Sequence, residues 1–209
     1  MRPKVKICGI TNLDDALLAC ELGANAVGFI FYPKSLRYIL PDKAKSICVN
    51  LPPFVTKVGV FVNCEPQEIE RIVKHTGLNL VQLHGDETAE YCSKIKTPYV
   101  KAFRVHQDFE ISSLSRYNSH TFLLDAFSEK SYGGTGLTFD WNIAKSAKKY
   151  GKIILAGGLT PENISEAILQ VKPYAVDISS GVEISPGKKS PEKLQALFKE
   201  IAAAKNAGR

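Results

Sequence analysis

The chain has 209 residues, of which 44% are hydrophobic and 23% are charged, and this composition excludes a largely disordered protein. The formal net charge of +6 is a mild excess that suits an anionic partner, either a phosphorylated metabolite or a nucleic acid. No linker or low-complexity segment divides the sequence, so we expect a single domain over residues 1–209.

Runs of strand-forming residues alternate along the chain with segments of helical spacing. We expect strands, most of them nearly continuous apolar stretches, at 5–8, 26–31, 57–62, 79–84, 99–105, 121–125, 152–156 and 175–179. We expect helices at 11–22, from 41, at 66–77, 87–95, 109–117 and 140–150, from 160, and from 190 to about 204. Apolar strands that are each followed by a helix predict a parallel α/β protein, and eight such units close a single (β/α)8 TIM barrel.

Two of the expected connections between a strand and its helix are long, at residues 32–40 and 126–139. The second carries Gly133, Gly134 and Gly136, which suits a mobile lid over a site. A surface loop without a function would have the same composition, so the sequence leaves both interpretations open.

The five cysteines indicate a reducing compartment. Their number is odd and no pair has the C-x-x-C spacing, which disfavours a disulfide framework or a structural zinc site. The first residues lack an apolar signal core, and the longest apolar runs fall far short of the roughly 20 residues that cross a bilayer. We therefore expect a cytoplasmic protein with no membrane partner.

Polar side chains gather at the carboxyl ends of the expected strands, which meet at one mouth in such a barrel. They include Cys8, Asn63, Cys64, Gln82, His84, Arg104, Asp125 and Asp177. A free cysteine is often only a small buried hydrophobe, but Cys8 lies between a strand end and a helix start, where a thiolate is favoured. Asp125 is far from the next helix and is therefore a weak candidate for a helix cap. The histidines are scattered, so we expect no metal site.

Glycine-rich segments follow the seventh and eighth strands. Gly157 and Gly158 come after the first of these strands, and Ser180 and Gly181 after the second. In (β/α)8 enzymes these two loops are a frequent phosphate site, because backbone N–H groups can approach an anion closely there. The lysine-rich segments at 145–152 and 187–189 are interpreted as solvated helix faces, and without interleaved aromatic residues they do not indicate nucleic-acid binding.

An ordered set of motifs from residue 6 to about 190 resembles the phosphoribosylanthranilate isomerase family. The motifs are Lys6-Ile7-Cys8-Gly9-Ile10-Thr11, Gly28-Phe29-Ile30-Phe31 with Ser35-Leu36-Arg37, Gly59-Val60-Phe61-Val62-Asn63, Val81-Gln82-Leu83-His84-Gly85, Tyr132-Gly133-Gly134-Thr135-Gly136 with Phe139-Asp140-Trp141, Leu155-Ala156-Gly157-Gly158-Leu159, and Asp177-Ile178-Ser179-Ser180-Gly181-Val182-Glu183. The resemblance departs at Leu36, where the family usually has proline before the arginine.

The resemblance implies a (β/α)8 barrel and a reaction without cofactor or metal. That reaction converts N-(5'-phosphoribosyl)anthranilate to 1-(2-carboxyphenylamino)-1-deoxyribulose 5-phosphate in tryptophan biosynthesis. The matching positions imply Cys8 as general base and Asp125 as general acid. The chemistry requires an ionised thiol and a protonated carboxylic acid at neutral pH, and we expect a helix N-terminus and Arg37 to support the thiolate.

The remaining site residues are assigned from the chemistry of the substrate. Arg37 is expected to bind the anthranilate carboxylate, because its planar fork matches that group. His84 and Asp177 are candidates for the sugar hydroxyls or the bridging amine. The two glycine-rich segments are expected to bind the phosphate. We expect a phosphosugar as partner, no nucleic acid, and a monomer or homodimer.

Three other classes of protein remain compatible with parts of this pattern. One is another phosphate-binding barrel enzyme, such as an epimerase or synthase that acts on a phosphosugar. The second is a basic nucleic-acid-binding protein, whose affinity would fall steeply with salt. The third is a catalytically inactive barrel that serves as a scaffold, which the intact acid, base and phosphate loops disfavour.

Overall fold

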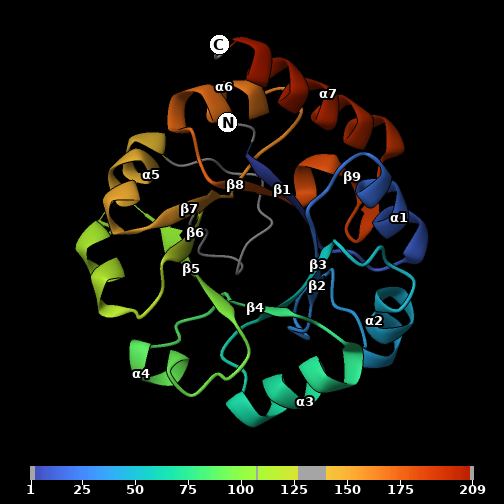
Figure 1. Cartoon of the computed structure of the whole chain (residues 1–209), viewed down its shortest axis with the longest axis vertical. Helices are drawn as coiled ribbons and strands as arrows, with labels where there is room; N and C mark the ends of the chain where they lie inside the picture. The colour runs from blue at the N-terminus through green and yellow to red at the C-terminus, as the bar shows by residue number, and fades with distance from the viewer. Residues whose placement is uncertain (1–2, 107, 127–139, 208–209) are drawn as a thin grey trace.

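The computed structural model describes residues 3–106, 108–126 and 140–207 of the chain. Within these residues, eight parallel strands close a barrel in chain order, and the first strand pairs with the eighth. Figure 1 looks along the barrel and shows the strands as an inner ring with the helices around it. The expected (β/α)8 fold is therefore confirmed.

The barrel strands lie within one residue of their expected bounds at either end. They are β1 (Lys4–Cys8), β2 (Ala26–Ile30), β3 (Thr56–Phe61), β4 (Leu80–Leu83), β5 (Tyr99–Val105), β6 (Thr121–Ala126), β7 (Lys152–Leu155) and β8 (Ala175–Ile178). Each is short and mainly buried, as parallel strands covered on both faces are. The apolar runs alone were sufficient to locate them.

The helices agree with the sequence less closely at their ends. They are α1 (Leu13–Glu21), α2 (Pro41–Cys48), α3 (Pro66–Thr76), α4 (Ala89–Cys92), α5 (Trp141–Ala147), α6 (Ile164–Val171) and α7 (Pro191–Ala207), with 3₁₀ turns η1 (Ile111–Arg116) and η2 (Lys148–Tyr150). The helix expected from 160 begins only at Ile164, because Asn163 closes a turn before it. Its Oδ1 accepts from the N–H of Thr160 at 2.9 Å, and its Nδ2 donates to the carbonyl of Gly158 at 2.8 Å.

The core has two layers because alternate strand residues point into the barrel and out toward the helices. The outward layer, which includes Val27 and Phe29, joins the strands to the helices in one large cluster. A smaller cluster of Val100, Ala102, Leu123 and Ala156 is packed separately. Polar residues replace apolar ones on the inward positions nearest the carboxyl ends of the strands, where a site can form.

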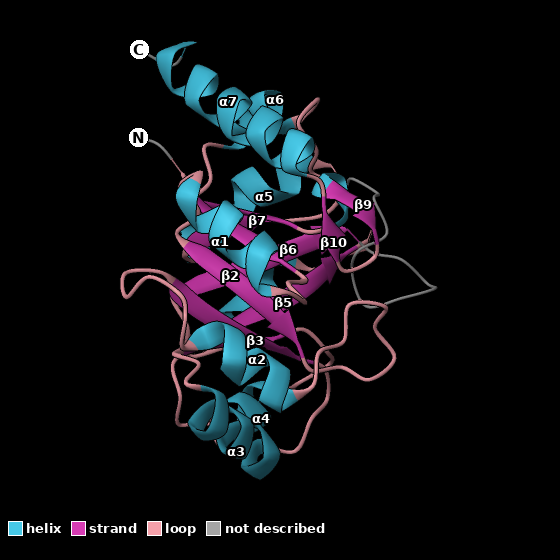
Figure 2. Ribbon diagram, turned by 90° about the vertical axis from the view of Figure 1, so that its right-hand side faces the viewer, coloured by secondary structure: helices cyan, strands magenta, loops and turns pink. Residues whose placement is uncertain are grey.

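An element that the sequence did not predict follows β8. The turn η3 (Ser180–Val182) leads into a hairpin of β9 (Glu183–Ser185) and β10 (Lys188–Lys189). Figure 2 shows this hairpin on the side toward which the barrel strands point. The interpretation of residues 187–189 as a solvated helix face is therefore wrong, and Lys189 is only 1% exposed. Two very short strands without apolar alternation leave no periodic signal in the sequence.

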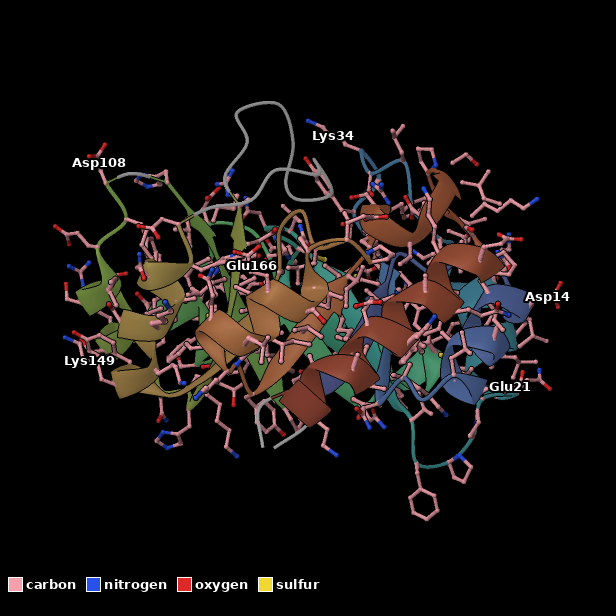
Figure 3. The ribbon with its side chains drawn as sticks, turned by 90° about the horizontal axis from the view of Figure 1, so that it is seen from above. Asp14, Glu21, Lys34, Asp108, Lys149 and Glu166 are labelled. Carbon is pink, nitrogen blue, oxygen red and sulfur yellow. The ribbon has the colours of Figure 1, made fainter. Side chains whose placement is uncertain are left out.

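The loops at the carboxyl ends of the strands share one side of the molecule. Figure 3 shows Lys34, which follows β2, and Asp108, which follows β5, at the same edge. The expected lid at 126–139 lies outside the described residues, apart from Ala126 at the end of β6. Within the part of the chain that the structure describes, no helix is long and apolar enough to cross a membrane.

A buried ion pair ties the end of β4 to β5. The ammonium of Lys101 lies 2.9 Å from Oε2 of Glu87 and also donates to the carbonyls of Leu83 and Gly85. The two side chains are 2% and 1% exposed. Glu87 is bent into this contact and accepts from the N–H of Gly85, so the helix expected at 87–95 begins only after it, with Thr88 as its N-cap.

We predict that Lys101→Met lowers the free energy of unfolding by about 3 kcal/mol, because it leaves the Glu87 carboxylate buried without its cation. Urea denaturation of the purified protein measures this loss. The matched control is Lys94→Met, which removes an ion pair to Glu90 whose side chains are 59% and 84% exposed. The control should cost less than about 1 kcal/mol. Equal losses in the two variants would contradict the prediction.

Candidate active site

A cavity at the carboxyl ends of the strands holds about 700 Å³ of open space, part of it continuous with solvent. It is lined by eight of the nine residues proposed from the sequence, namely Cys8, Arg37, His84, Asp125, Gly157, Gly158, Asp177 and Ser180. The ninth, Gly181, packs directly behind the wall, where a Cβ would collide with the carbonyl oxygen of Leu159. Barrel closure thus brings together residues that are far apart in the sequence.

Cys8 ends β1 and is 6% exposed. Its Sγ and the Nζ of Lys6 both lie close to Gly28 on the neighbouring strand, at 2.7 and 3.2 Å from the position that a Cβ would take there. Burial raises the pKa of the Cys8 thiol above its ordinary 9.0, while Lys6 and Lys189 act in the opposite direction. The cations that support a thiolate are therefore these two lysines.

His84, which directly follows β4, and Asp125 on β6 lie next to each other at the cavity. Nε2 of His84 lies 3.2 Å from Oδ2 of Asp125, and both side chains are 9% exposed. Despite this distance, Nε2 of His84 has no hydrogen-bond partner among the described residues. We therefore treat the pair as a close electrostatic contact in which Nε2 remains available to another group.

Lys6 connects the two sides of the cavity floor. Its ammonium lies 2.6 Å from Oδ2 of Asp177 on β8 and 2.9 Å from Oε1 of Gln82 on β4. Burial opposes the charge, but Asp177 and Cys8 more than offset that effect and raise the pKa of Lys6 above 10.5. Lys6 is therefore a permanent cation beneath the proposed base.

Three buried polar atoms around this cavity have no protein partner among the described residues. They are Nε2 of His84, Oδ1 of Asp177 and Oγ of Ser179. Buried polar groups are almost always hydrogen-bonded in folded proteins, so these atoms are suited to contacts with a polar ligand. All three belong to residues that line the cavity.

The loops after β7 and β8 form the opposite wall. Gly157 and Gly158 have φ angles of +86° and +58°, a left-handed conformation that side chains disfavour. The close approach of Gly181 to the backbone at Leu159 packs the second loop against the first. Glycine-rich loops packed together in this way can present main-chain N–H groups to an anion.

Arg37, in the loop between β2 and α2, is held by the hairpin after β8. Its Nε and Nη2 donate to the carboxylate of Glu183 at 2.7 to 3.0 Å. Lys189 lies behind this carboxylate at 2.9 Å and also donates to the carbonyls of Cys8 and Ser179. Burial acts against the charge of Glu183, but the two cations hold its pKa below its usual range.

Comparison with known proteins agrees with this geometry. Residues 5–200 match the family model described as N-(5'phosphoribosyl)anthranilate (PRA) isomerase. A relative of that name from Citrifermentans bemidjiense is 53% identical over an alignment that covers 94% of this chain and 96% of the relative. A relative from Geobacter sulfurreducens is 49% identical over 94% of this chain and 97% of its own length. The chain belongs to the N-(5'-phosphoribosyl)anthranilate isomerase family.

Solved structures of phosphoribosylanthranilate isomerases have the same fold. The enzyme from Thermotoga maritima is 46% identical, with a TM-score of 0.90 over 96% of this chain and 99% of that one. The enzyme from Thermus thermophilus is 42% identical, with a TM-score of 0.89 over 96% and 98% of the two chains. A further isomerase structure, 45% identical with a TM-score of 0.87 over 96% and 99%, contains reduced 1-(o-carboxyphenylamino)-1-deoxyribulose 5-phosphate.

Several charged residues that contact the cavity lining of this family member were not assigned a role from its sequence. Lys6 could have been found, because it precedes Cys8 by two residues and so points inward with it. Glu183 and Lys189 could not, because nothing local indicates that they are buried. The loop between β2 and α2 is ordered although it has Leu36 in place of the proline usual in the family. A β-bridge joins Ile30 to Tyr38 across this loop, and Glu183 binds Arg37. No group of three or more potential metal-ligating side chains occurs in the described part of this isomerase.

We predict that the rate at which iodoacetamide alkylates Cys8 in the ligand-free isomerase increases with pH. The midpoint of this increase should lie above pH 9.0, the ordinary pKa of a thiol. Burial favours the neutral thiol, and only the thiolate reacts, so the rate must lag behind that of an exposed cysteine as pH rises. Mass spectrometry of the peptide that contains Cys8 follows the reaction. A midpoint below 9.0 would contradict the prediction.

Proposed function

We propose that this protein isomerises N-(5'-phosphoribosyl)anthranilate in tryptophan biosynthesis, with Cys8 as general base and Asp125 as general acid. The observation that carries the proposal is the cavity itself, which has a thiol and a carboxyl group on its walls together with two glycine-rich loops. The family membership supports the substrate, and the fold supports the location of the site.

The reaction needs no redox partner because it moves hydrogen within one molecule. Ring opening gives a proton to the furanose oxygen, and Asp125 is its proposed donor. Removal of the C2′ proton by Cys8 then gives an enolamine. Ketone formation takes a proton from the C2′ hydroxyl and adds one to C1′, which can return both side chains to their starting states. An aldose amine thereby becomes a ketose amine with no net gain or loss of protons.

The productive state has a thiolate at Cys8 and a proton on Asp125, so the two groups share one proton before the reaction starts. Lys6 and Lys189 favour the thiolate by their charge. Proton transfer by positioned groups of this kind contributes about 10²–10⁴-fold each.

The two ends of the substrate are assigned to opposite parts of the cavity. The phosphate is proposed to bind at Gly157, Gly158, Ser180 and Gly181. The anthranilate carboxylate is proposed to bind Arg37, whose Nη1 is not engaged by Glu183. His84 and Asp177 are proposed to contact sugar hydroxyls or the bridging amine through their unpartnered atoms.

The cellular location, the partners and the oligomeric state of the enzyme are predicted from its sequence. We propose a cytoplasmic protein whose partner is a small phosphosugar and not a nucleic acid or a membrane. We propose a monomer or a homodimer, and the isomerase of Thermotoga maritima is described as dimeric. A single catalytic domain is proposed for residues 1–209.

We predict that Cys8→Ala and Asp125→Asn each lower kcat by about 10²–10⁴-fold with a much smaller change in KM, because each removes one proton transfer and little of the binding surface. The fluorescence of N-(5'-phosphoribosyl)anthranilate follows its consumption. Cys20→Ala, a change in α1 away from the cavity, is the matched control and should retain the turnover of the unaltered protein. Near-normal kcat in either cavity variant would remove that residue from its role.

We predict that Arg37→Ala raises KM by about tenfold or more with a smaller effect on kcat, since it removes a charged hydrogen-bond donor for the substrate carboxylate. Glu183 keeps Lys189 as a partner in this variant, so the hairpin should remain folded. Arg71→Ala, which removes an exposed arginine paired with Glu68 on α3, is the control. Unchanged KM and kcat in Arg37→Ala would place the carboxylate elsewhere.

A further inference from the structure

A chain of buried polar side chains crosses the barrel between the proposed base and the proposed acid. Lys6 lies against Cys8 and donates to Oε1 of Gln82 at 2.9 Å. Nε2 of Gln82 lies 2.8 Å from Nδ1 of His84, and Nε2 of His84 lies 3.2 Å from Oδ2 of Asp125. Gln82 is 3% exposed, so water cannot readily replace either of its hydrogen bonds.

The charge of Lys6 fixes the direction of both hydrogen bonds of Gln82. An ammonium can only donate, so the Gln82 atom that faces Lys6 must be the carbonyl oxygen. The amide nitrogen of Gln82 then faces His84 and donates to Nδ1. Because Nδ1 accepts, the proton of the neutral imidazole must be on Nε2, the nitrogen next to Asp125. The tautomer of His84 thus follows from the chemistry of its neighbours, independently of any assignment of hydrogen positions.

This tautomer matters for the acid. With its proton on Nε2, neutral His84 cannot accept the proton that Asp125 needs for the substrate. With its proton on Nδ1, His84 would present a basic nitrogen 3.2 Å from Oδ2 and would hold that proton itself. We propose that Gln82 is a positioning residue that keeps His84 in the Nε2–H form and so leaves the proton of Asp125 available for catalysis.

The inference rests on the proposed roles of Cys8 and Asp125. It adds a reason why Cys8 is the ionised group and Asp125 the protonated one. Lys6 stabilises the thiolate by its charge, and the same ammonium orients Gln82. The charge of Lys6 favours the thiolate, and the orientation of Gln82 prevents Nε2 of His84 from accepting the proton of Asp125. Two other charged groups act on Cys8, because Asp177 beside Lys6 raises the pKa of its thiol and Lys189 lowers it. Gln82 contacts none of the substrate ends assigned above, which is why its role is indirect.

The test is Gln82→Glu, which retains the shape of the side chain but offers only acceptors. Nδ1 of His84 must then carry a proton, so Nε2 is either an open acceptor for the proton of Asp125 or has already taken that proton. The added negative charge also weakens the support that Lys6 gives to the thiolate. We expect kcat to fall by about 100-fold or more, with KM changed by much less. The matched control is Gln67→Glu, the same chemical change at an exposed position of α3.

A readout that does not depend on turnover comes from ¹⁵N nuclear magnetic resonance of the ligand-free protein with labelled histidine. The His84 signals should show a proton on Nε2 alone in the unaltered protein and a proton on Nδ1 in Gln82→Glu. Gln82→Met, which adds no charge, covers the case in which Gln82→Glu does not fold. It should give a mixture of His84 tautomers and lower kcat by about tenfold, the equivalent of one lost hydrogen bond.

Two results would overturn the inference. One is a His84 with its proton on Nδ1 in the unaltered protein. The other is unchanged kcat in Gln82→Glu while Cys8→Ala and Asp125→Asn are inactive, which would leave the proposed function intact. If those two variants remain active instead, the proposed function fails, and the resonance experiment still decides the state of His84.

Discussion

The ion pair between Lys6 and Asp177 is the contact on which the cavity depends. The two residues lie opposite each other in the register of β1 and β8, where the barrel closes, and their charged atoms are 2.6 Å apart. A buried ammonium is costly unless it is paired and its protons are satisfied. Asp177 and Gln82 supply acceptors, and the Cys8 sulfur lies beside them. The Lys6–Asp177 pair therefore joins the two strands at which the barrel closes, and the same ammonium lies beside the thiol and orients Gln82.

Two further buried lysines hold the strand ends in place. Lys101 binds the carbonyls of Leu83 and Gly85 around the His84 position, and Lys189 binds those of Cys8 and Ser179. An ammonium with three protons can join several acceptors at once, and here each cluster also contains a carboxylate. Because the proposed base Cys8, and His84 beside the proposed acid, sit at strand ends restrained in this way, little reorganisation of these two residues is needed before the chemistry.

The sequence located the strands and the residues at their ends because both signals are local. An apolar run marks a strand covered on both faces, and the residue after it lies at the mouth once the barrel closes. Cys8, His84 and Asp125 were found in this way, and all three line the cavity. The hairpin after β8 was missed because Glu183 and Lys189 are polar residues in strands too short to show a period. Their burial depends on each other and on Arg37.

What the sequence determined by itself is the order of strands and helices, and with it the set of side chains that meet at one face. What only the tertiary structure decided is which of those side chains touch. Lys6 and Asp177 are separated by 171 positions and Arg37 and Glu183 by 146, and nothing near either residue in the chain specifies its partner. The first contact forms because barrel closure brings β1 and β8 into register, and the second because the hairpin after β8 lies against the loop after β2. The charge states and tautomers then follow from the neighbours that closure supplies.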